Sequence, residues 1–280
     1  MNSFTSGLYI VSTPIGNLDD ITLRSLEVLK KSDIVLCEDT RRSLKLLNHF
    51  KIKKKLISYH KFNEKKELSK VIEYLKEGKI LSLISDAGTP TLSDPGSLLV
   101  NKCIEENIKI HPIPGASSIT SAMSVSGFND RFIFYGFLPK TENELIKCIS
   151  VFENLDYCIV FFLPGLKINF YLKHFKSYFF DRNILIAREI TKIHETFYRD
   201  SINTIKPFKN ILKGELTVVI SKKNNNNNPM QDSEIRSQAA MYLKKYSLKD
   251  VVELVSKKEN LSKNKVYQIC LEIKKNEKNN

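Results

Sequence analysis

Residues 80–96 decide the fold, and they read ILSLI followed by SDAGTPTLSDPG. The apolar run 80–84 predicts a buried strand. The next twelve residues hold two glycines, two prolines and two aspartates, and they therefore predict a compact loop rather than more strand or helix. In an open α/β sheet, loops at the carboxyl ends of strands hold ligands. We expect a ligand site here; the alternative is a turn that caps a helix over 96–106.

The same arrangement of strand, polar loop and helix repeats along the first part of the chain. Strands are predicted over 8–12, 34–37, 56–59 and 108–113, and helices over 21–31, 43–50 and 64–77. The loops that follow the strands read TPIGN (13–17), EDTRR (38–42), HKFNE (60–64) and PGASS (114–118). This repetition predicts a parallel sheet covered by helices, with every loop at one edge.

A second α/β unit is expected after residue 118. A helix of small residues over 119–126 precedes predicted strands at 131–137, 157–162, 183–187 and 215–220. The expected domains are an N-terminal α/β domain (1–114), a C-terminal α/β domain (115–222), an Asn-rich linker (223–230) and a small helical module (231–280). In the module, helices over 232–245, 248–259 and 263–274 are predicted. The turn 260–262 favours either a helix-turn-helix or plain helical packing.

Charge and cysteine usage narrow the class of partner. The formal net charge of the 280 residues is +13, which suits a phosphate-rich partner or a solvated lysine surface. The five cysteines form no close pair, so neither a metal centre nor a redox centre is predicted. No apolar run is long enough to cross a membrane, and residues 1–7 lack the features of a signal peptide. A cytoplasmic protein is expected.

Common catalytic motifs are missing from the sequence. There is no G-x-G-x-x-G after the first strand and no P-loop lysine, so neither route to nucleotide binding is predicted. No His, Cys and carboxylate spacing is typical of a metal site, and there is no nucleophile elbow.

Six loop motifs in order carry a resemblance to a known family. They are STPIGNL (12–18), EDTR (38–41), SDAGTPTLSDPG (85–96), PGAS (114–117), DRF with GFLP (130–139) and AREITKIHE (187–195). The set resembles the branch of the tetrapyrrole methylase family that 2'-O-methylates a cytidine of bacterial small-subunit ribosomal RNA, over about residues 8–221. One departure is Phe62, where the branch often has a second histidine after His60.

The resemblance implies two α/β domains with S-adenosylmethionine in the cleft between them, and a homodimer. It implies methyl transfer to the ribose of a decoding-centre cytidine in 16S rRNA, customarily position 1402, in the free RNA or the 30S subunit. A sulfonium cofactor needs carbonyls, carboxylates and a dry apolar pocket, which the predicted loops offer. The implied cofactor contacts are Pro14, Asp86, Ala87, Gly88, Ser117, Ser118, Leu163 and Ala187, with Gly214 near the adenine.

Methyl transfer to a hydroxyl needs a positioned base. The carboxylates of the loops are the candidates: Glu189 or Glu195 first, and Glu38 or Asp86 second. Lys192 or Arg41 would contact phosphate or polarise the ribose. The predicted RNA-binding surface comprises Arg41, Arg42, Lys51, Lys53, Lys54 and Lys55. The helical module is a possible second clamp on the RNA.

Two other functions stay open at this point. A C-methyltransferase of tetrapyrrole precursors would share the fold, although its first loop tends to be Gly-rich and acidic rather than TPIGN. A non-enzymatic nucleic-acid-binding protein would use the C-terminal helices, but it would leave the polar loops unexplained.

Overall fold

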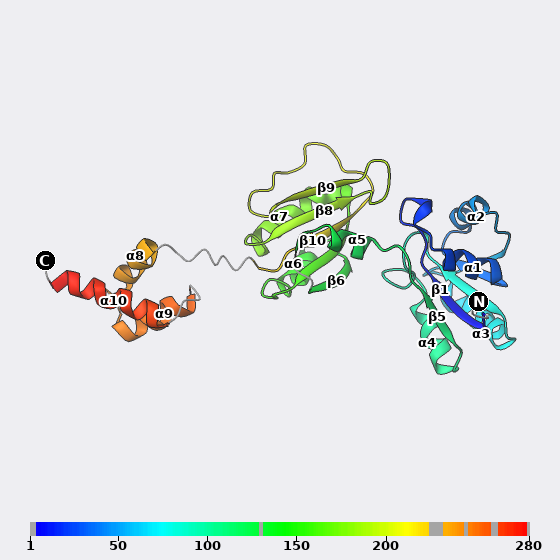
Figure 1. Cartoon of the computed structure of the whole chain (residues 1–280), viewed down its shortest axis with the longest axis horizontal. Helices are drawn as coiled ribbons and strands as arrows, with labels where there is room; N and C mark the ends of the chain where they lie inside the picture. The colour runs from blue at the N-terminus through cyan, green and yellow to red at the C-terminus, as the bar shows by residue number, and fades with distance from the viewer. Residues whose placement is uncertain (1–3, 129–130, 224–231, 244–245, 259–262, 279–280) are drawn as a thin grey trace. The chain divides into compact units, whose positions relative to one another are not determined.

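The protein is described by a computed structural model covering residues 4–128, 131–223, 232–243, 246–258 and 263–278 (Figure 1). The chain divides into two compact units, residues 1–224 and 225–280. The predicted Asn-rich linker, apart from Lys223, and the predicted turn 260–262 lie outside the described residues.

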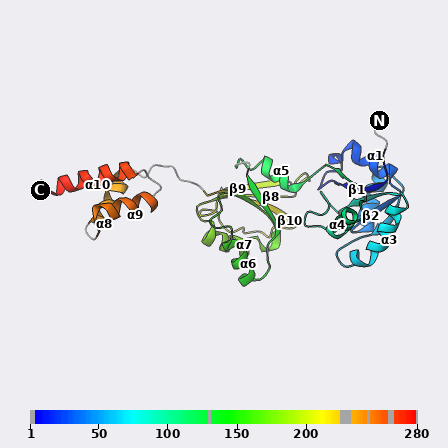
Figure 2. The same cartoon turned by 90° about the horizontal axis from the view of Figure 1, so that it is seen from below.

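The first sheet is entirely parallel, as the repeated motif predicts. Its five strands follow the order β3-β2-β4-β1-β5. They are β1 (Gly7–Val11), β2 (Ile34–Cys37), β3 (Lys55–Ser58), β4 (Ile80–Ile84) and β5 (Ile110–Ile113). Helices α1 (Leu23–Lys31) and α2 (Thr40–His49) pack on one face, and α3 (Glu64–Lys76) and α4 (Ser97–Glu105) on the other. Figure 2 shows α1 and α3 on opposite sides of the strands.

The alternation of side chains along β1 explains why its sequence is so apolar. Leu8 packs into the core beneath α3 and α4, whereas Tyr9 and Val11 pack into the core beneath α1 and α2. Successive strand residues point to opposite faces, and both faces are covered by helices. A strand buried on two sides therefore reads as a continuous hydrophobic run.

The second sheet is mixed, with the order β6-β7-β10-β8-β9. Its strands are β6 (Phe132–Phe137), β7 (Cys158–Pro164), β8 (Asn183–Arg188), β9 (Thr196–Ser201) and β10 (Glu215–Ile220). β6 and β7 are parallel, while β10 runs antiparallel to both β7 and β8. β9 was not predicted, because it is an edge strand of sequence TFYRDS without a buried apolar run.

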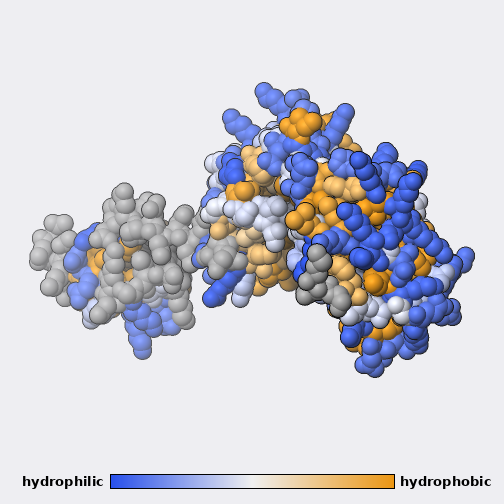
Figure 3. Space-filling model, turned by 45° about the vertical axis from the view of Figure 1, so that its right-hand side comes forward, coloured by the Kyte–Doolittle hydropathy of each residue, from blue (hydrophilic) through white to orange (hydrophobic). Residues whose placement is uncertain are grey.

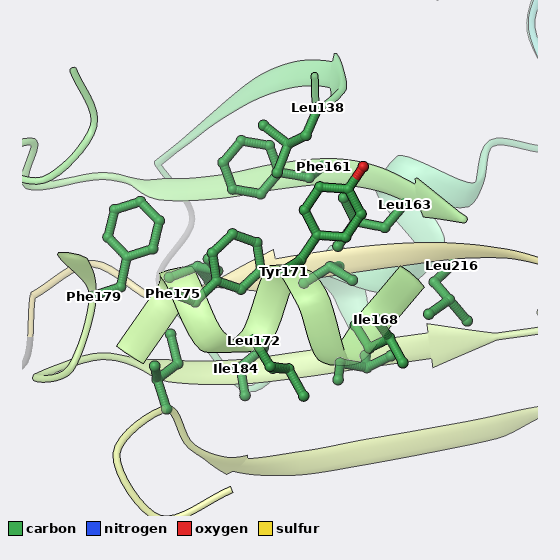
Figure 4. Close-up of a cluster of buried hydrophobic side chains, with 14 of the residues drawn as sticks. Leu138, Phe161, Leu163, Ile168, Tyr171, Leu172, Phe175, Phe179, Ile184 and Leu216 are labelled. Atoms are coloured by element: carbon green, nitrogen blue, oxygen red, sulfur yellow. The ribbon is translucent and has the colours of Figure 1, made fainter. Parts of the chain in front are cut away.

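The larger core of the second sheet lies beneath α6 (Glu142–Ser150) and α7 (Ile168–Tyr178), where the aromatic rings of Phe161, Tyr171 and Phe175 gather (Figure 4). The short helix α5 (Ser118–Ser124) covers the other face. A 3₁₀ turn, η1 (Leu18–Asp20), lies between β1 and α1, and another, η2 (Gly165–Lys167), lies between β7 and α7.

Several predicted boundaries are wrong by two residues or more, and for two of them the cause is clear. Helix α2 begins at Thr40 rather than at 43, because Asp39 accepts a hydrogen bond from the Arg41 N–H (2.8 Å) and caps it. Strand β7 continues through Leu163 and Pro164, because both pair with β10.

The C-terminal unit contains the three predicted helices, α8 (Asp232–Leu243), α9 (Leu248–Lys258) and α10 (Lys263–Lys278). They share a hydrophobic core that includes Ile235, Val251 and Val266. Among the described residues, no helix is long and apolar enough to cross a membrane. On the face drawn in Figure 3, hydrophobic residues form patches bordered by hydrophilic ones.

Candidate functional site

The loops at the carboxyl edge of the first sheet are joined by hydrogen bonds. Thr13, after β1, and Gly88, after β4, exchange two backbone hydrogen bonds of 2.9 and 3.0 Å. Gly88 has a φ of +81°, a conformation that side chains rarely adopt. Asp86 links β4 to β2: its carboxylate accepts the Asp39 N–H (3.2 Å) and pairs with Arg42 (3.1 Å). The predicted loop cluster is therefore one connected structure.

A cavity of about 410 Å³ opens between these loops and the second sheet. Its polar side chains include Arg42, Asp94, Glu189, Lys192 and Glu215. The apolar part of the lining comes from Ile15, Leu92, Ile119, Phe137, Phe162 and Ile190. An adjacent hollow of about 330 Å³ is lined by Pro14, Gly16 and Asp86, among others. Arg42 and Lys192 line both spaces. The arrangement provides charged groups of both signs next to apolar walls.

The loop between β8 and β9, residues 189–195, closes one side of the cavity. Its Thr191 hydroxyl accepts a hydrogen bond (2.9 Å) from the N–H of Asn17, in the loop that follows β1 of the first sheet. A side chain at Gly16 would lie only 2.6 Å from that hydroxyl oxygen. Within the loop, Glu195 accepts the Thr191 N–H (2.7 Å). Glu189 and Thr191 have φ values of +50° and +67°, so this loop is strained at two residues, and one of them, Glu189, lines the cavity.

Two carboxyl groups near the cavity have raised pKa values. Burial raises the pKa of Asp94 to about 6, helped by the negative charges of Glu38 and Asp86. Burial and the neighbouring Asp86 also raise the pKa of Glu38. In contrast, the hydrogen bonds from Arg41 lower the pKa of Asp39 to about 2. Asp94 is thus a carboxyl group of the cavity wall with a pKa of about 6.

The structure brings most of the predicted cofactor residues together. Gly88, Ser117, Ser118 and Ala187 line the larger cavity; Pro14 and Asp86 line the adjacent hollow; and Ala87 lines both. Leu163 lines neither: its side chain is fully buried in the core of the second sheet (Figure 4), next to the cavity-lining Phe162. Gly214 lines neither space, and its O accepts the Gly165 N–H (2.8 Å).

The predicted catalytic residues divide into two groups. Glu189 and Lys192 line the cavity, and Glu189 pairs with Arg188 (3.3 Å). Glu38 and Glu195 line neither space. Arg41 also lies outside, with its guanidinium paired to Asp39 (2.8 Å).

The predicted RNA-binding residues do not form one surface. Arg41 and Arg42 follow the carboxyl end of β2, beside the cavity. Lys53, Lys54 and Lys55 lie at the start of β3, where Lys55 is in register with Ile34 at the amino end of β2. The three lysines therefore lie at the amino ends of the strands, whereas the arginines lie at the carboxyl ends.

The sequence interpretation missed Asp94 and Glu215 as site residues. Asp94 lies in the decisive stretch itself, four residues after Pro90, and its position there was a usable signal. Glu215 begins the central strand β10, and nothing in the sequence places it opposite the first sheet.

The two sheets with their covering helices place the chain in a class of α/β proteins whose fold is also found in solved structures. The methyltransferase CobJ matches with a TM-score of 0.60 at 15% identity, covering 78% of this chain and 94% of that one. Diphthine synthase matches with a TM-score of 0.58 at 18% identity, covering 76% and 89%. These likenesses concern the fold.

The chain belongs to the family of tetrapyrrole (corrin/porphyrin) methylases, whose model matches residues 7–206. Relatives called ribosomal RNA small subunit methyltransferase I are much closer in sequence than the solved structures. That of Mesomycoplasma conjunctivae is 45% identical over 222 residues, 78% of this chain and 92% of the relative. That of Buchnera aphidicola is 39% identical over 284 aligned positions, 99% and 100%.

Proposed function

We propose that this protein transfers a methyl group from S-adenosylmethionine to the 2'-hydroxyl of a cytidine in 16S rRNA. The observation that carries the proposal is the cavity with mixed lining, built from the predicted loops. Its support from sequence is that relatives at 37–45% identity are called ribosomal RNA small subunit methyltransferase I. The solved tetrapyrrole methyltransferases, which represent the alternative, are only 12–17% identical to this chain.

The lining suits S-adenosylmethionine. The cavity volume falls within the range of small-molecule pockets, about 300–1,000 Å³. The carboxylates of Asp94, Glu189 and Glu215 favour a positively charged sulfonium, and the apolar wall keeps water away from it. When bound, this cofactor supplies a methyl group on a positively charged sulfur, ready for displacement.

The chain's own residues would then prepare the hydroxyl. A carboxylate of the cavity wall, Asp94 or Glu189, accepts the proton of the 2'-hydroxyl as the ribose oxygen forms its bond to the methyl carbon and the carbon–sulfur bond breaks. Arg42 and Lys192 line both hollows and can hold the flanking phosphates. Glu195 has a positioning role: it accepts the Thr191 N–H and so fixes the loop that carries Glu189.

The direct test is incorporation of labelled methyl from S-adenosylmethionine into unmethylated 30S subunits, naked 16S rRNA and a tetrapyrrole precursor. Modification of one cytidine ribose in either RNA sample establishes the reaction. Methylation of the tetrapyrrole alone overturns it in favour of the alternative.

The substitution Glu189→Gln separates the two candidate bases. If Glu189 accepts the proton, methyl transfer falls by roughly 10²–10⁴-fold while S-adenosylhomocysteine still binds. Calorimetric titration and single-turnover methylation measure the two effects. Full activity assigns the role to Asp94.

The proposal extends to assembly and location. We expect a homodimer, to be tested by analytical ultracentrifugation, and action in the cytoplasm, where ribosomal subunits are found. Position 1402 is the expected target, which mapping of the modified nucleotide checks.

A further inference from the structure

Phe62 exposes an aromatic ring that the fold itself does not use. Its side chain is 94% exposed, more than any other aromatic residue among those the structure describes. Exposing a phenylalanine forgoes the hydrophobic stabilisation that burial of such a side chain gives. A partner that covers the ring recovers this free energy.

The turn that carries Phe62 is held in place by hydrogen bonds. The Asn63 side chain accepts the His60 N–H (2.8 Å) and donates to the Ser58 carbonyl (2.9 Å). The Phe62 N–H donates to Nδ1 of His60 (3.2 Å). The ring is therefore presented by an ordered turn, so that little conformational entropy remains to be lost when a partner binds.

The turn follows β3 at the same edge of the sheet as the functional loops. Its neighbour Tyr59 donates its N–H to the Cys37 carbonyl (2.8 Å), immediately before Glu38. His60 also lies close enough to Glu38 to lower that carboxyl's pKa, against the larger effect of burial. Phe62 therefore lies at the same end of the strands as the cavity. It follows β3, one strand away from the loop that follows β2.

Three exposed lysines lie within four residues of Phe62 in the sequence. Lys61, Lys65 and Lys66 are exposed, and none forms an ion pair within the described part of the chain. The carboxylates of the same turn are Glu64 and Glu67, and one oxygen of Glu64 is buried without a partner. An aromatic face among unpaired lysines is the combination that binds single-stranded nucleic acid, through stacking and phosphate contacts. A second copy of this chain is a less suitable partner, because its own Lys61, Lys65 and Lys66 would repel these lysines.

We propose that Phe62 is a stacking platform for an unpaired base of the RNA substrate, with Lys61, Lys65 and Lys66 contacting the adjoining phosphates. The platform rests on the proposed function for its substrate class. It would hold a nucleotide near the target and leave the cavity free for the reacting ribose.

The test compares Phe62→Ala, Phe62→Leu and Phe62→Tyr in the full chain. The first assay is anisotropy of a fluorescein-labelled single-stranded RNA and of its duplex. We expect Phe62→Ala and Phe62→Leu to weaken single-strand binding about 5- to 100-fold, with Phe62→Tyr close to wild type, because only an aromatic face stacks. Duplex binding and S-adenosylhomocysteine binding should not change. Phe180→Ala is the matched control: its ring is 60% exposed, but it precedes β8, away from the cavity-lining end of that strand.

The second assay is methyl transfer to 30S subunits, where Phe62→Ala and Phe62→Leu should raise KM with little change in kcat, and Phe62→Tyr should match the wild type. Equal single-strand binding by wild type and Phe62→Ala overturns the platform. A shift of Phe62→Ala to a smaller species in ultracentrifugation, with RNA binding intact, also overturns it and assigns the ring to self-association. Because the anisotropy assay needs no methyl transfer, absence of methylation by the wild type contradicts the proposed function and leaves the platform separately tested.

Discussion

At the scale of single residues, Asp94 combines a place in the cavity wall with a pKa of about 6. A base with that pKa is ionised at neutral pH and still accepts a proton, which is what the proposed transfer needs. Burial is the main cause of this value, and the negative charges of Glu38, Asp86 and Glu215 add to it because they also disfavour the ionised form.

For Asp94 as base, kcat/KM should rise with pH through about 6 and then level off. Asp94→Asn should lose roughly 10²–10⁴-fold in rate and also lose this limb of the profile. Glu38→Gln removes a nearby negative charge without touching the cavity, so it should move the limb to lower pH. A pH profile of Glu38→Gln identical to that of the wild type would exclude Asp94 as the titrating group.

The same pKa predicts an effect of pH on stability. Because the folded-state pKa of Asp94 is raised above its ordinary value of 3.8, its protonated form favours the fold below the unfolded pKa. That contribution is lost as pH rises through about 6. The melting temperature of Asp94→Asn, measured by calorimetry, should therefore be higher than that of the wild type at about pH 8 and close to it at about pH 4. A constant difference across this range would contradict the raised pKa.

The contacts of Arg182 indicate a structural role for this residue. The side chain is completely buried. Its guanidinium donates to five backbone carbonyls, those of Phe152, Glu153, Leu155, Tyr157 and Ser221, at 2.7–3.2 Å. It thereby ties the segment before β7 to the residue that follows β10.

Arg182→Met should destabilise the first unit by about 3 kcal/mol or more, because several buried carbonyls lose their donors at once. Urea denaturation followed by circular dichroism measures the change. Arg199→Met serves as control: Arg199 donates to the single carbonyl of Val125 at the surface, so its loss should cost less than about 0.5 kcal/mol. Similar stabilities for both variants would contradict this role.

At the scale of elements, the loop 189–195 shows both the reach and the limit of the sequence. Its mixed charges marked it as a site, and Glu189 and Lys192 do line the cavity. Its contact with the first sheet, through Thr191 and Asn17, joins residues 174 positions apart and leaves no local pattern. Similarly, the lysines 53–55 follow Arg41 and Arg42 closely in the chain, yet helix α2 returns them to the other edge of the sheet.

Gly16→Ala tests this contact. The added methyl would meet Thr191, Lys192 and Ile190 at 2.6–2.8 Å, so the loop must move and the cavity wall with it. We expect S-adenosylhomocysteine affinity, measured by calorimetry, to fall on the order of tenfold. Gly78→Ala is the control, because that glycine has a φ of +83° but nothing within 4 Å. It should lower stability by about 1 kcal/mol and leave the affinity unchanged.

At the scale of the whole molecule, the C-terminal unit has its own hydrophobic core and is not shared by every relative. The Thermotoga maritima protein aligns over 219 residues, which are 98% of its length and 77% of this chain. That length accommodates the unit of residues 1–224 but not both units.

Deletion of residues 229–280 should therefore leave S-adenosylhomocysteine binding unchanged while weakening RNA binding. The expected RNA effect is on the order of tenfold, since several lysines that can contact phosphate are lost. Calorimetry and anisotropy measure the two affinities. Unchanged RNA affinity in the truncated protein would contradict a clamp role for this unit.

The sequence predicted the first sheet well because its central strands β1, β2 and β4 are apolar runs buried on both faces, and a polar loop follows each of them. The second sheet was harder. The antiparallel direction of β10 and its place between β7 and β8 depend on pairing partners that lie 50 residues and more before it or across a loop. The edge strand β9 lacks an apolar run altogether.

The central position of β10 has a consequence for synthesis on the ribosome. All strands of the first sheet are present once residue 113 has been made, so that sheet can form while translation continues. The second sheet must wait until β10 has also been made, because β7 and β8 are joined only through β10, whose last residue is Ile220. Glu215 and Thr217 of this strand also line the cavity. A nascent chain therefore stays inactive until nearly all of its first unit has emerged.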